Sequence, residues 1–111
     1  MRRGSEYEER ACLYLQDKGY SIVARNYHCR SGEIDIVARQ GGELVFVEVK
    51  GGKDTSLGHP AERFNPRKLD RIIACAFRFM EEMGLEEPFR VDLVVVLEDR
   101  IEHYENVGYE F

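Results

Sequence analysis

The chain has 111 residues, of which 43% are hydrophobic, and this is enough for one compact domain over residues 1–111. No apolar run is long enough to span a membrane and no secretory leader is recognisable, so we expect a cytoplasmic protein with no membrane partner. The net charge of −5 argues against a polyanionic partner, but residues 1–80 carry fourteen bases and eleven acids, a net charge of +3, and this part permits one.

The spacing of apolar residues predicts a first helix over Ser5–Lys18. Ser5 is placed to cap its amino end, with Glu8 completing a capping box, and Gly19 is placed to end it. Three strands are predicted to follow: Tyr20–Tyr27, Glu33–Arg39 and Glu43–Lys50. A polar turn region over Asn26–Gly32 separates the first two strands, and Gly41-Gly42 turns the chain between the second and third.

The stretch Gly51–Asn65 has no periodicity and is predicted to be a mobile loop, long enough to have a function. Asn65 and Pro66 form an N-cap and first-position pair for a second helix, which Gly84 ends. Two final strands are predicted: Phe89–Leu97 and Arg100–Val107. The order αβββαββ predicts an α/β fold, in which helices flank a mixed five-stranded sheet and the second helix crosses over between strands.

The cysteines are odd in number, far apart and in no C-x-x-C spacing: Cys12, Cys29 and Cys75. This pattern indicates neither a disulfide framework nor a zinc site, and we expect reduced thiols. The histidines lie in no nucleophile motif and are expected at the surface: His28, His59 and His103. No glycine pattern indicates a nucleotide cofactor.

Charged residues interrupt the two apolar strands of the central hairpin: Asp35 in one, Glu48 and Lys50 in the other. If the hairpin forms, Asp35 lies beside Glu48. A buried charge is costly unless it is paired or binds a metal, so this group is either a structural salt bridge or a divalent-metal site with a lysine beside it. We favour the metal site, with Mg²⁺ or Mn²⁺ held by Asp35, Glu48 and the carbonyl of Val49.

Such a metal would activate a water at a phosphodiester bond. Lys50 would orient or deprotonate that water, or neutralise charge developing on the phosphate, and the sequence leaves these roles open. Glu8 is a further acid able to reach the site from the first helix. Asp92 also interrupts a buried strand, and it is expected to bond locally or to pair with Arg90 or Lys50.

Arg67, Lys68 and Arg71 lie near the start of the second helix, where cations oppose the helix dipole, so helix stability does not explain them. A solvated helix face is one explanation and phosphate contact is the other. The candidate nucleic-acid contacts are Arg25, Asn26, Lys53, Arg67, Lys68 and Arg71.

The pattern of Asp35 followed by Glu48-x-Lys50 resembles the PD-(D/E)XK nuclease superfamily, whose restriction-endonuclease-like core has three layers. More closely, the whole chain resembles the YraN family of small bacterial proteins, which is similar to archaeal Holliday junction resolvases. The residues that carry this likeness are Tyr7-Glu8, Ala11, Tyr14-Leu15, Gly19-Tyr20, Arg25-Asn26-Tyr27, residues 32–38, residues 45–50, Pro66-Arg67-Lys68 and Arg90-Val91-Asp92.

The resemblance implies metal-dependent phosphodiester cleavage, with Asp35, Glu48 and Lys50 at the catalytic positions and Glu8 as the helix acid. The chain departs from the family where a small hydroxyl residue and a basic residue usually follow the lysine, because Gly51-Gly52-Lys53 stands there. The leading hypothesis is a nuclease acting on DNA, including branched or repair intermediates. The alternatives are a nucleic-acid-binding module with little or no cleavage activity and a protein-interaction domain, and analogy with the resolvases suggests a homodimer.

Overall fold

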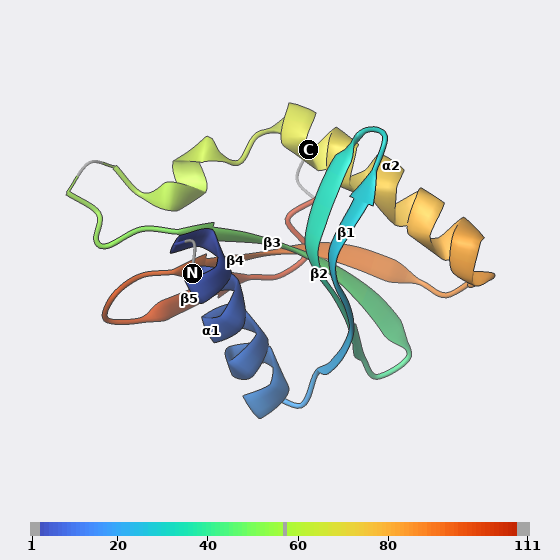
Figure 1. The fold of residues 1–111 in the computed structure, drawn as a ribbon, viewed down its shortest axis with the longest axis horizontal. Helices are drawn as coiled ribbons and strands as arrows, with labels where there is room; N and C mark the ends of the chain where they lie inside the picture. The colour runs from blue at the N-terminus through green and yellow to red at the C-terminus, as the bar shows by residue number, and fades with distance from the viewer. Residues whose placement is uncertain (1–2, 57, 109–111) are drawn as a thin grey trace.

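Two helices enclose a five-stranded sheet in the computed structural model, which describes residues 3–56 and 58–108 (Figure 1). The elements in chain order are α1 (Arg3–Asp17), β1 (Ser21–Cys29), β2 (Gly32–Gln40), β3 (Glu43–Gly51), the 3-10 helix η1 (Pro60–Arg63), α2 (Pro66–Met83), β4 (Phe89–Val96) and β5 (Ile101–Tyr104). The predicted α/β class and the predicted order αβββαββ are confirmed. Within the described residues, no helix has both the length and the apolar character that a membrane span requires.

The strands lie in the spatial order β1-β2-β3-β4-β5. All neighbouring pairs are antiparallel except β3 and β4, which are parallel because α2 carries the chain back across the sheet between them. The sheet is therefore mixed, as the sequence predicted. β3 lies at its centre and is paired on both sides.

The two helices cover opposite faces of the sheet. Alternation along β3 sends Leu44 and Phe46 into the core under α2, and Val45 and Val47 into the core under α1. α1 contributes Ala11, Cys12 and Leu15 to its core, and α2 contributes Leu69, Ile72, Cys75, Ala76 and Phe79 to the other. The molecule consequently has three layers, helix, sheet and helix.

The ends of the helices follow most of the predicted capping signals. Gly19, with φ of 94°, ends α1, and the Asn65 side chain caps α2 by accepting a hydrogen bond from the amide of Lys68 across 3.0 Å. Gly84 ends α2 in the left-handed conformation with φ of 65°. The prediction of Ser5 as N-cap is wrong, because α1 begins two residues earlier, at Arg3.

The first hairpin differs from the prediction at its tip. β1 continues to Cys29, so the predicted turn over Asn26–Gly32 is wrong for its first half, and the turn itself is only Arg30-Ser31. Asn26 lies within the strand with φ of 53°, a left-handed conformation that asparagine tolerates better than most residues. The longer strand extends the β1–β2 hairpin beside α2 (Figure 1).

The region between β3 and α2 is more ordered than a loop without periodicity suggests. It contains η1, and the Nδ1 atom of His59 caps this helix by accepting a hydrogen bond from the amide of Ala61 across 3.0 Å. The other ring nitrogen, Nε2, lies 2.5 Å from Glu102 of β5. Residue 57 lies outside the described residues.

Cys29 and Cys75 form a disulfide between the end of β1 and the middle of α2. The expectation that all three cysteines are reduced thiols is therefore wrong for this pair, whereas Cys12 is free and buried. The pairing depends on the extra length of β1, which brings Cys29 over α2. Because 46 residues separate the two cysteines in the sequence, their spacing carried no signal.

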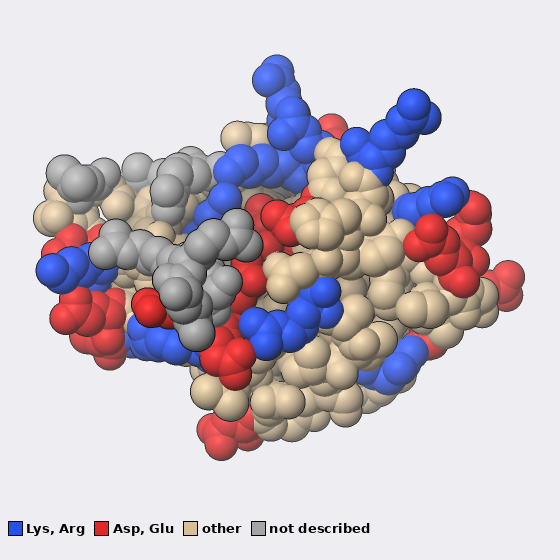
Figure 2. Space-filling view, in the orientation of Figure 1, with Lys and Arg blue, Asp and Glu red and all other residues tan. Residues whose placement is uncertain are grey.

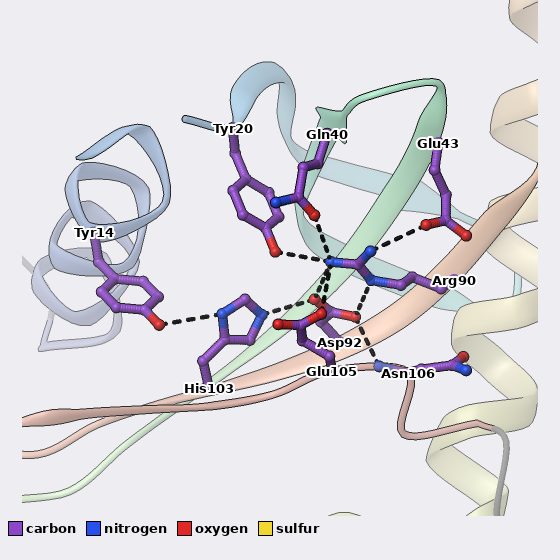
Figure 3. A network of polar contacts seen from close by, with 9 residues as sticks. All are labelled: Tyr14, Tyr20, Gln40, Glu43, Arg90, Asp92, His103, Glu105 and Asn106. Carbon is purple, nitrogen blue, oxygen red and sulfur yellow. Dashed lines mark hydrogen bonds and ion pairs between the residues drawn. The ribbon is translucent and has the colours of Figure 1, made fainter. Parts of the chain in front are cut away.

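Asp92 lies at the centre of a buried polar network between β4, β5 and α1 (Figure 3). Its carboxylate accepts hydrogen bonds from Arg90 Nε at 2.9 Å and from the amide of Asn106 at 2.9 Å, and it lies 2.7 Å from His103 Nε2. These partners hold the pKa of Asp92 below its usual range, against the effect of burial. Asp92 thus pairs with Arg90, one of the two predicted partners.

His103, which contacts Asp92 in this network, does not lie at the surface. Its side chain is only 5% exposed, and its Nδ1 atom lies 3.2 Å from the hydroxyl of Tyr14 on α1. His59 is also partly covered, whereas His28 is 73% exposed, as expected of a surface histidine. The surface prediction for His103 is wrong because the rings of Tyr14 on α1 and of Tyr20 pack against it, and these tertiary contacts have no local pattern.

Candidate active site at the fork between β2 and β3

The central hairpin opens where its charged residues lie. β2 and β3 pair from Gln40 and Glu43 up to Ile36 and Val47, and the ladder stops there. Beyond this point β2 stays paired with β1, and β3 stays paired with β4. The two strands therefore diverge at the next residue of each, Asp35 on β2 and Glu48 on β3. We call this divergence the fork.

Asp35 and Glu48 are the two residues at the fork. Asp35 is buried, with only 6% of the residue exposed. Its side chain accepts a hydrogen bond from the amide of Val49 across 2.7 Å and is also hydrogen-bonded to Glu48. Burial, and then the neighbouring Glu48 carboxylate, raise the pKa of Asp35 to about 8. The predicted proximity of Asp35 and Glu48 is confirmed, and the pair retains a proton near neutral pH.

Lys50 lies on the same side of β3 as Glu48, the side that faces α2. Its Nζ atom is 3.9 Å from Glu48 Oε2, and both side chains are mostly buried, with exposed fractions of 19% and 16%. At this distance the ion pair is at the limit of contact and lacks hydrogen-bond geometry. The ammonium is consequently not tied to one carboxylate, and it lies at the cleft described below.

Glu8 approaches the fork from α1. Burial, and then the carboxylates of Asp35 and Glu33, raise its pKa, and the charge of Arg25 and then a hydrogen bond from Asn26 oppose this shift. Asn26 lies opposite Asp35 in the register, because Arg25 pairs with Ile36 and Tyr27 with Ile34. In the structure Asn26 is a partner of Glu8. The sequence had indicated Asn26 only as a candidate nucleic-acid contact.

A cleft of about 320 Å³ opens on the α2 side of the fork. One wall comes from the β1–β2 hairpin and the fork, and the other comes from the first turns of α2. The residues that line it are Ser31, Gly32, Glu33, Asp35, Glu48, Val49, Lys50, Lys68, Arg71 and Ile72. Carboxylates and cations therefore face one another across the same opening.

Of the predicted nucleic-acid contacts, Lys68 and Arg71 line the cleft, and Arg67 is exposed one residue before Lys68. The other two cations lie elsewhere. Arg25 forms an ion pair with Glu9 at 2.9 Å, and Lys53 lies beside the turn between β4 and β5. Figure 2 shows Lys and Arg side chains projecting over the hairpin tip and the start of α2, with carboxylates recessed beneath them.

Two cleft residues, Ser31 and Ile72, had no functional signal in the sequence. Ser31 is in a two-residue turn, and only the packing of that turn against α2 brings it to the cleft. Ile72 belongs to the apolar stripe of α2, which pattern alone assigns to the core.

The donor set fits a hard cation. Among the described residues, no three His, Cys, Asp or Glu side chains gather as a metal-binding group. Asp35 and Glu48 meet at the fork, and Mg²⁺ needs only one or two carboxylates when water and a substrate phosphate complete its shell. A carboxylate pair that must otherwise hold a proton is suited to exchange it for a cation. Zinc, which prefers nitrogen and sulfur ligands, fits less well.

Gly51 follows the site lysine because nothing larger fits. A Cβ atom on Gly51 would lie 1.9 Å from ring carbon Cδ2 of Tyr7, on α1. At Gly51, the departure from the family pattern thus has a packing reason. The contact fixes the amino end of α1, which carries Glu8, against the end of β3.

The fold and the fork define a three-layer α/β protein with a carboxylate pair and a lysine in a cation-rimmed cleft. Residues 7–96 match the sequence model of the uncharacterised protein family UPF0102, and the chain belongs to this family. A UPF0102 protein of Phocaeicola vulgatus is 40% identical over 110 residues, which are 96% of this chain and 91% of the relative. Those of Aquifex aeolicus and Thermotoga maritima are 44% and 45% identical, over 97% and 92% of this chain and 98% and 93% of theirs.

Proposed function

We propose that this protein is a Mg²⁺- or Mn²⁺-dependent nuclease that hydrolyses phosphodiester bonds in DNA, including branched or repair intermediates. The observation that carries the proposal is the meeting of Asp35 and Glu48 at the fork, with Lys50 beside them in a cleft whose far wall is cationic. A structural salt bridge explains one carboxylate and one lysine. It does not explain a second buried carboxylate that shares a proton with the first.

Each residue has a role that its position supports. Asp35, Glu48 and the carbonyl of Val49 would hold the cation, which when bound polarises the scissile phosphate and acidifies a water. Lys50, the only lysine of β3, would orient or deprotonate the attacking water, or neutralise charge that develops on the phosphate. Glu8 would accept a hydrogen bond or a proton from the other side of the fork. Lys68 and Arg71 would bind the substrate backbone.

The likeness to the restriction-endonuclease-like fold supports this assignment. The central hairpin carries Asp35 and Glu48-x-Lys50 in that superfamily's order, and the helices flank the sheet on both faces. Fold likeness alone does not define an activity, so the proposal depends on the residues at the fork. The homodimer stays a prediction from analogy, which size-exclusion chromatography with light scattering would test.

The test is a cleavage assay on plasmid, single-stranded and four-way-junction DNA and on RNA, with Mg²⁺, Mn²⁺ or a chelator. The variants are Asp35→Asn, Glu48→Gln and Lys50→Ala, and Arg100→Ala on the β4–β5 turn is the control. We expect metal-dependent cleavage that falls by about 100-fold or more in the three site variants and is unchanged in the control.

If the protein binds nucleic acid but cleaves none with either Mg²⁺ or Mn²⁺, the result would instead support the alternative, a nucleic-acid-binding module. The same cationic wall would then be its functional part. A wild-type protein that neither binds nor cuts any of these nucleic acids would refute both, and would leave the protein-interaction domain.

A further inference from the structure

A second groove lies next to the cleft, further along α2. It encloses about 490 Å³ between the hairpin tip and the middle of α2, and we call it the hairpin groove. The residues that line it are Tyr27, His28, Cys29, Arg30, Ser31, Ala74, Arg78 and Glu82. Ser31 lines both the cleft and the hairpin groove, so the two openings are continuous at the turn of the hairpin.

Cations line this path on the α2 side. Lys68, Arg71 and Arg78 follow one another at steps of three and seven residues, which keeps them on the side of α2 that faces the hairpin. Ala74 lies between Arg71 and Arg78, and its small side chain leaves the groove open. Arg30 adds a cation from the hairpin side.

The partners of these cations differ. Over residues 3–56 and 58–108, the side chains of Arg30 and Arg71 have no hydrogen bond or ion pair. Arg78 forms ion pairs with Glu82 at 3.3 Å and Glu81 at 3.6 Å, both in exposed positions of the same helix. Such exposed pairs contribute little to stability, so a phosphate is able to replace them.

Tyr27 and His28, two of the other polar residues that line the hairpin groove, already have partners. Tyr27 donates a hydrogen bond from its hydroxyl to Glu82 across 2.5 Å, and His28 Nε2 lies 3.5 Å from Glu33. The disulfide of Cys29 forms part of the lining and fixes the hairpin side of the groove to α2. The disulfide therefore links the two walls of the hairpin groove, and the arginines are the cations that it offers to an anion.

We propose that a nucleic-acid strand bound in the cleft continues through the hairpin groove, where Arg30 and Arg78 contact the phosphates that flank the cleaved bond. This inference rests on the proposed function and adds a subsite to it. Arg71 and Arg78 are about 10 Å apart along the helix axis. That distance is about three base steps of a stacked strand, so the subsite recognises a flank and not the cleaved bond itself.

The test measures binding of a long single-stranded DNA and of a dinucleotide over a range of salt concentrations, in chelator so that no strand is cut. Each lost phosphate contact on a single strand lowers the salt slope by about 0.7 and, at about 0.1 M salt, the affinity by about fivefold. We expect Arg30→Ala with Arg78→Ala to weaken binding of the long strand by about 25-fold. Binding of the dinucleotide, which occupies the cleft alone, should not change.

Two further variants serve as a charge control and as a test of the carboxylate that pairs with Arg78. Arg100→Ala removes one 49% exposed arginine on the β4–β5 turn, so it reports the effect of losing one positive charge there, half of the charge that the double variant removes. Glu82→Gln removes a carboxylate that competes for Arg78 and keeps an acceptor for Tyr27, so it should raise affinity for the long strand. Equal affinities of the arginine double variant and Arg100→Ala would overturn the subsite.

The outcomes for the subsite and for the nuclease are separable. If wild type binds and cuts but the double variant binds as Arg100→Ala does, the nuclease proposal stands and the subsite falls. If wild type binds without cutting and the double variant loses affinity, the subsite stands without the nuclease. If wild type binds no nucleic acid, both fall.

Discussion

The ring of Tyr7 lies against the α-carbon of Gly51, so the start of α1 and the end of β3 meet with no room for a side chain. We expect Gly51→Ala to destabilise the protein by about 1 to 3 kcal/mol, because its Cβ overlaps a ring and the two elements must separate. Urea unfolding measures the change. Gly42→Ala is the control, because a Cβ there meets nothing within 4 Å. In a protein that already carries Tyr7→Ala, Gly51→Ala should lower the free energy of unfolding by less than it does in wild type. If the effects of the two substitutions on this free energy simply add, the contact is contradicted.

The carboxylate pair predicts an unusual dependence of stability on pH. The pKa of Asp35 is raised from 3.8 to about 8, so the folded state binds this proton more tightly than the unfolded state. The resulting stabilisation is complete below about pH 4 and is lost as the pH rises through about 8. Without metal, wild type should lose stability over this range, and Asp35→Asn should not.

Thermal unfolding in chelator at several pH values makes this measurement. Asp35→Asn should be the more stable protein above pH 8 and similar to wild type in mild acid, where Asp35 is protonated. Added Mg²⁺ should raise the Tm of wild type at high pH and leave the variant unchanged. A variant that is less stable at every pH would identify Asp35 as a structural ion-pair partner.

The disulfide predicts a dependence on redox conditions. It closes a segment of 46 residues between Cys29 and Cys75, for which the chain-entropy relation gives about 4 kcal/mol of stabilisation. We expect a reductant to lower the Tm of the wild-type protein. The Cys29→Ser and Cys75→Ser double variant should already have the lower Tm and should not respond to reductant. If the reductant lowers the Tm of the wild-type protein and of the double variant equally, the disulfide is contradicted.

The network around Asp92 predicts a large loss of stability on removal of one charge. In Asp92→Asn, the mostly buried Arg90 loses its buried counter-ion, and we expect a cost of about 3 to 5 kcal/mol. Because the pKa of Asp92 is lowered, its contribution is present above pH 4 and is lost as the pH falls further. Asp99→Asn, at an exposed position, should cost less than about 1 kcal/mol in the same denaturant titration. Similar costs for the two variants would show that the network adds little.

Local pattern was enough to predict the element order and the meeting of Asp35 with Glu48. Both depend on short-range rules, namely strand alternation, a Gly-Gly turn and helix caps. The features that sequence reasoning missed depend on contacts between distant segments. Cys29 reaches Cys75 because β1 is longer than its composition suggests, and His103 is buried because Tyr14 of α1 packs against it.

The position of the basic residues was the least predictable part of the site. Lys68 and Arg71 reach the cleft because the first turns of α2 form its wall, whereas Lys53, which is close in sequence to Lys50, lies beside the β4–β5 turn. Arg30 had no functional signal, because only its place next to α2 gives it one. Sequence distance from the site is a poor guide where a strand end, a turn and a helix converge.

The hydrogen bond from the amide of Val49 to Asp35 gives that aspartate a structural task besides any chemistry, since the β2–β3 ladder has ended and the carboxylate replaces a backbone acceptor. A descendant that lost the activity would still be selected to keep an acceptor at position 35. Glu48 bonds to the Asp35 side chain and lies 3.9 Å from Lys50, but among the described residues neither Glu48 nor Lys50 has a side-chain hydrogen bond to the backbone. Among the relatives of this chain, the retention of both residues is therefore the more informative mark of a working site.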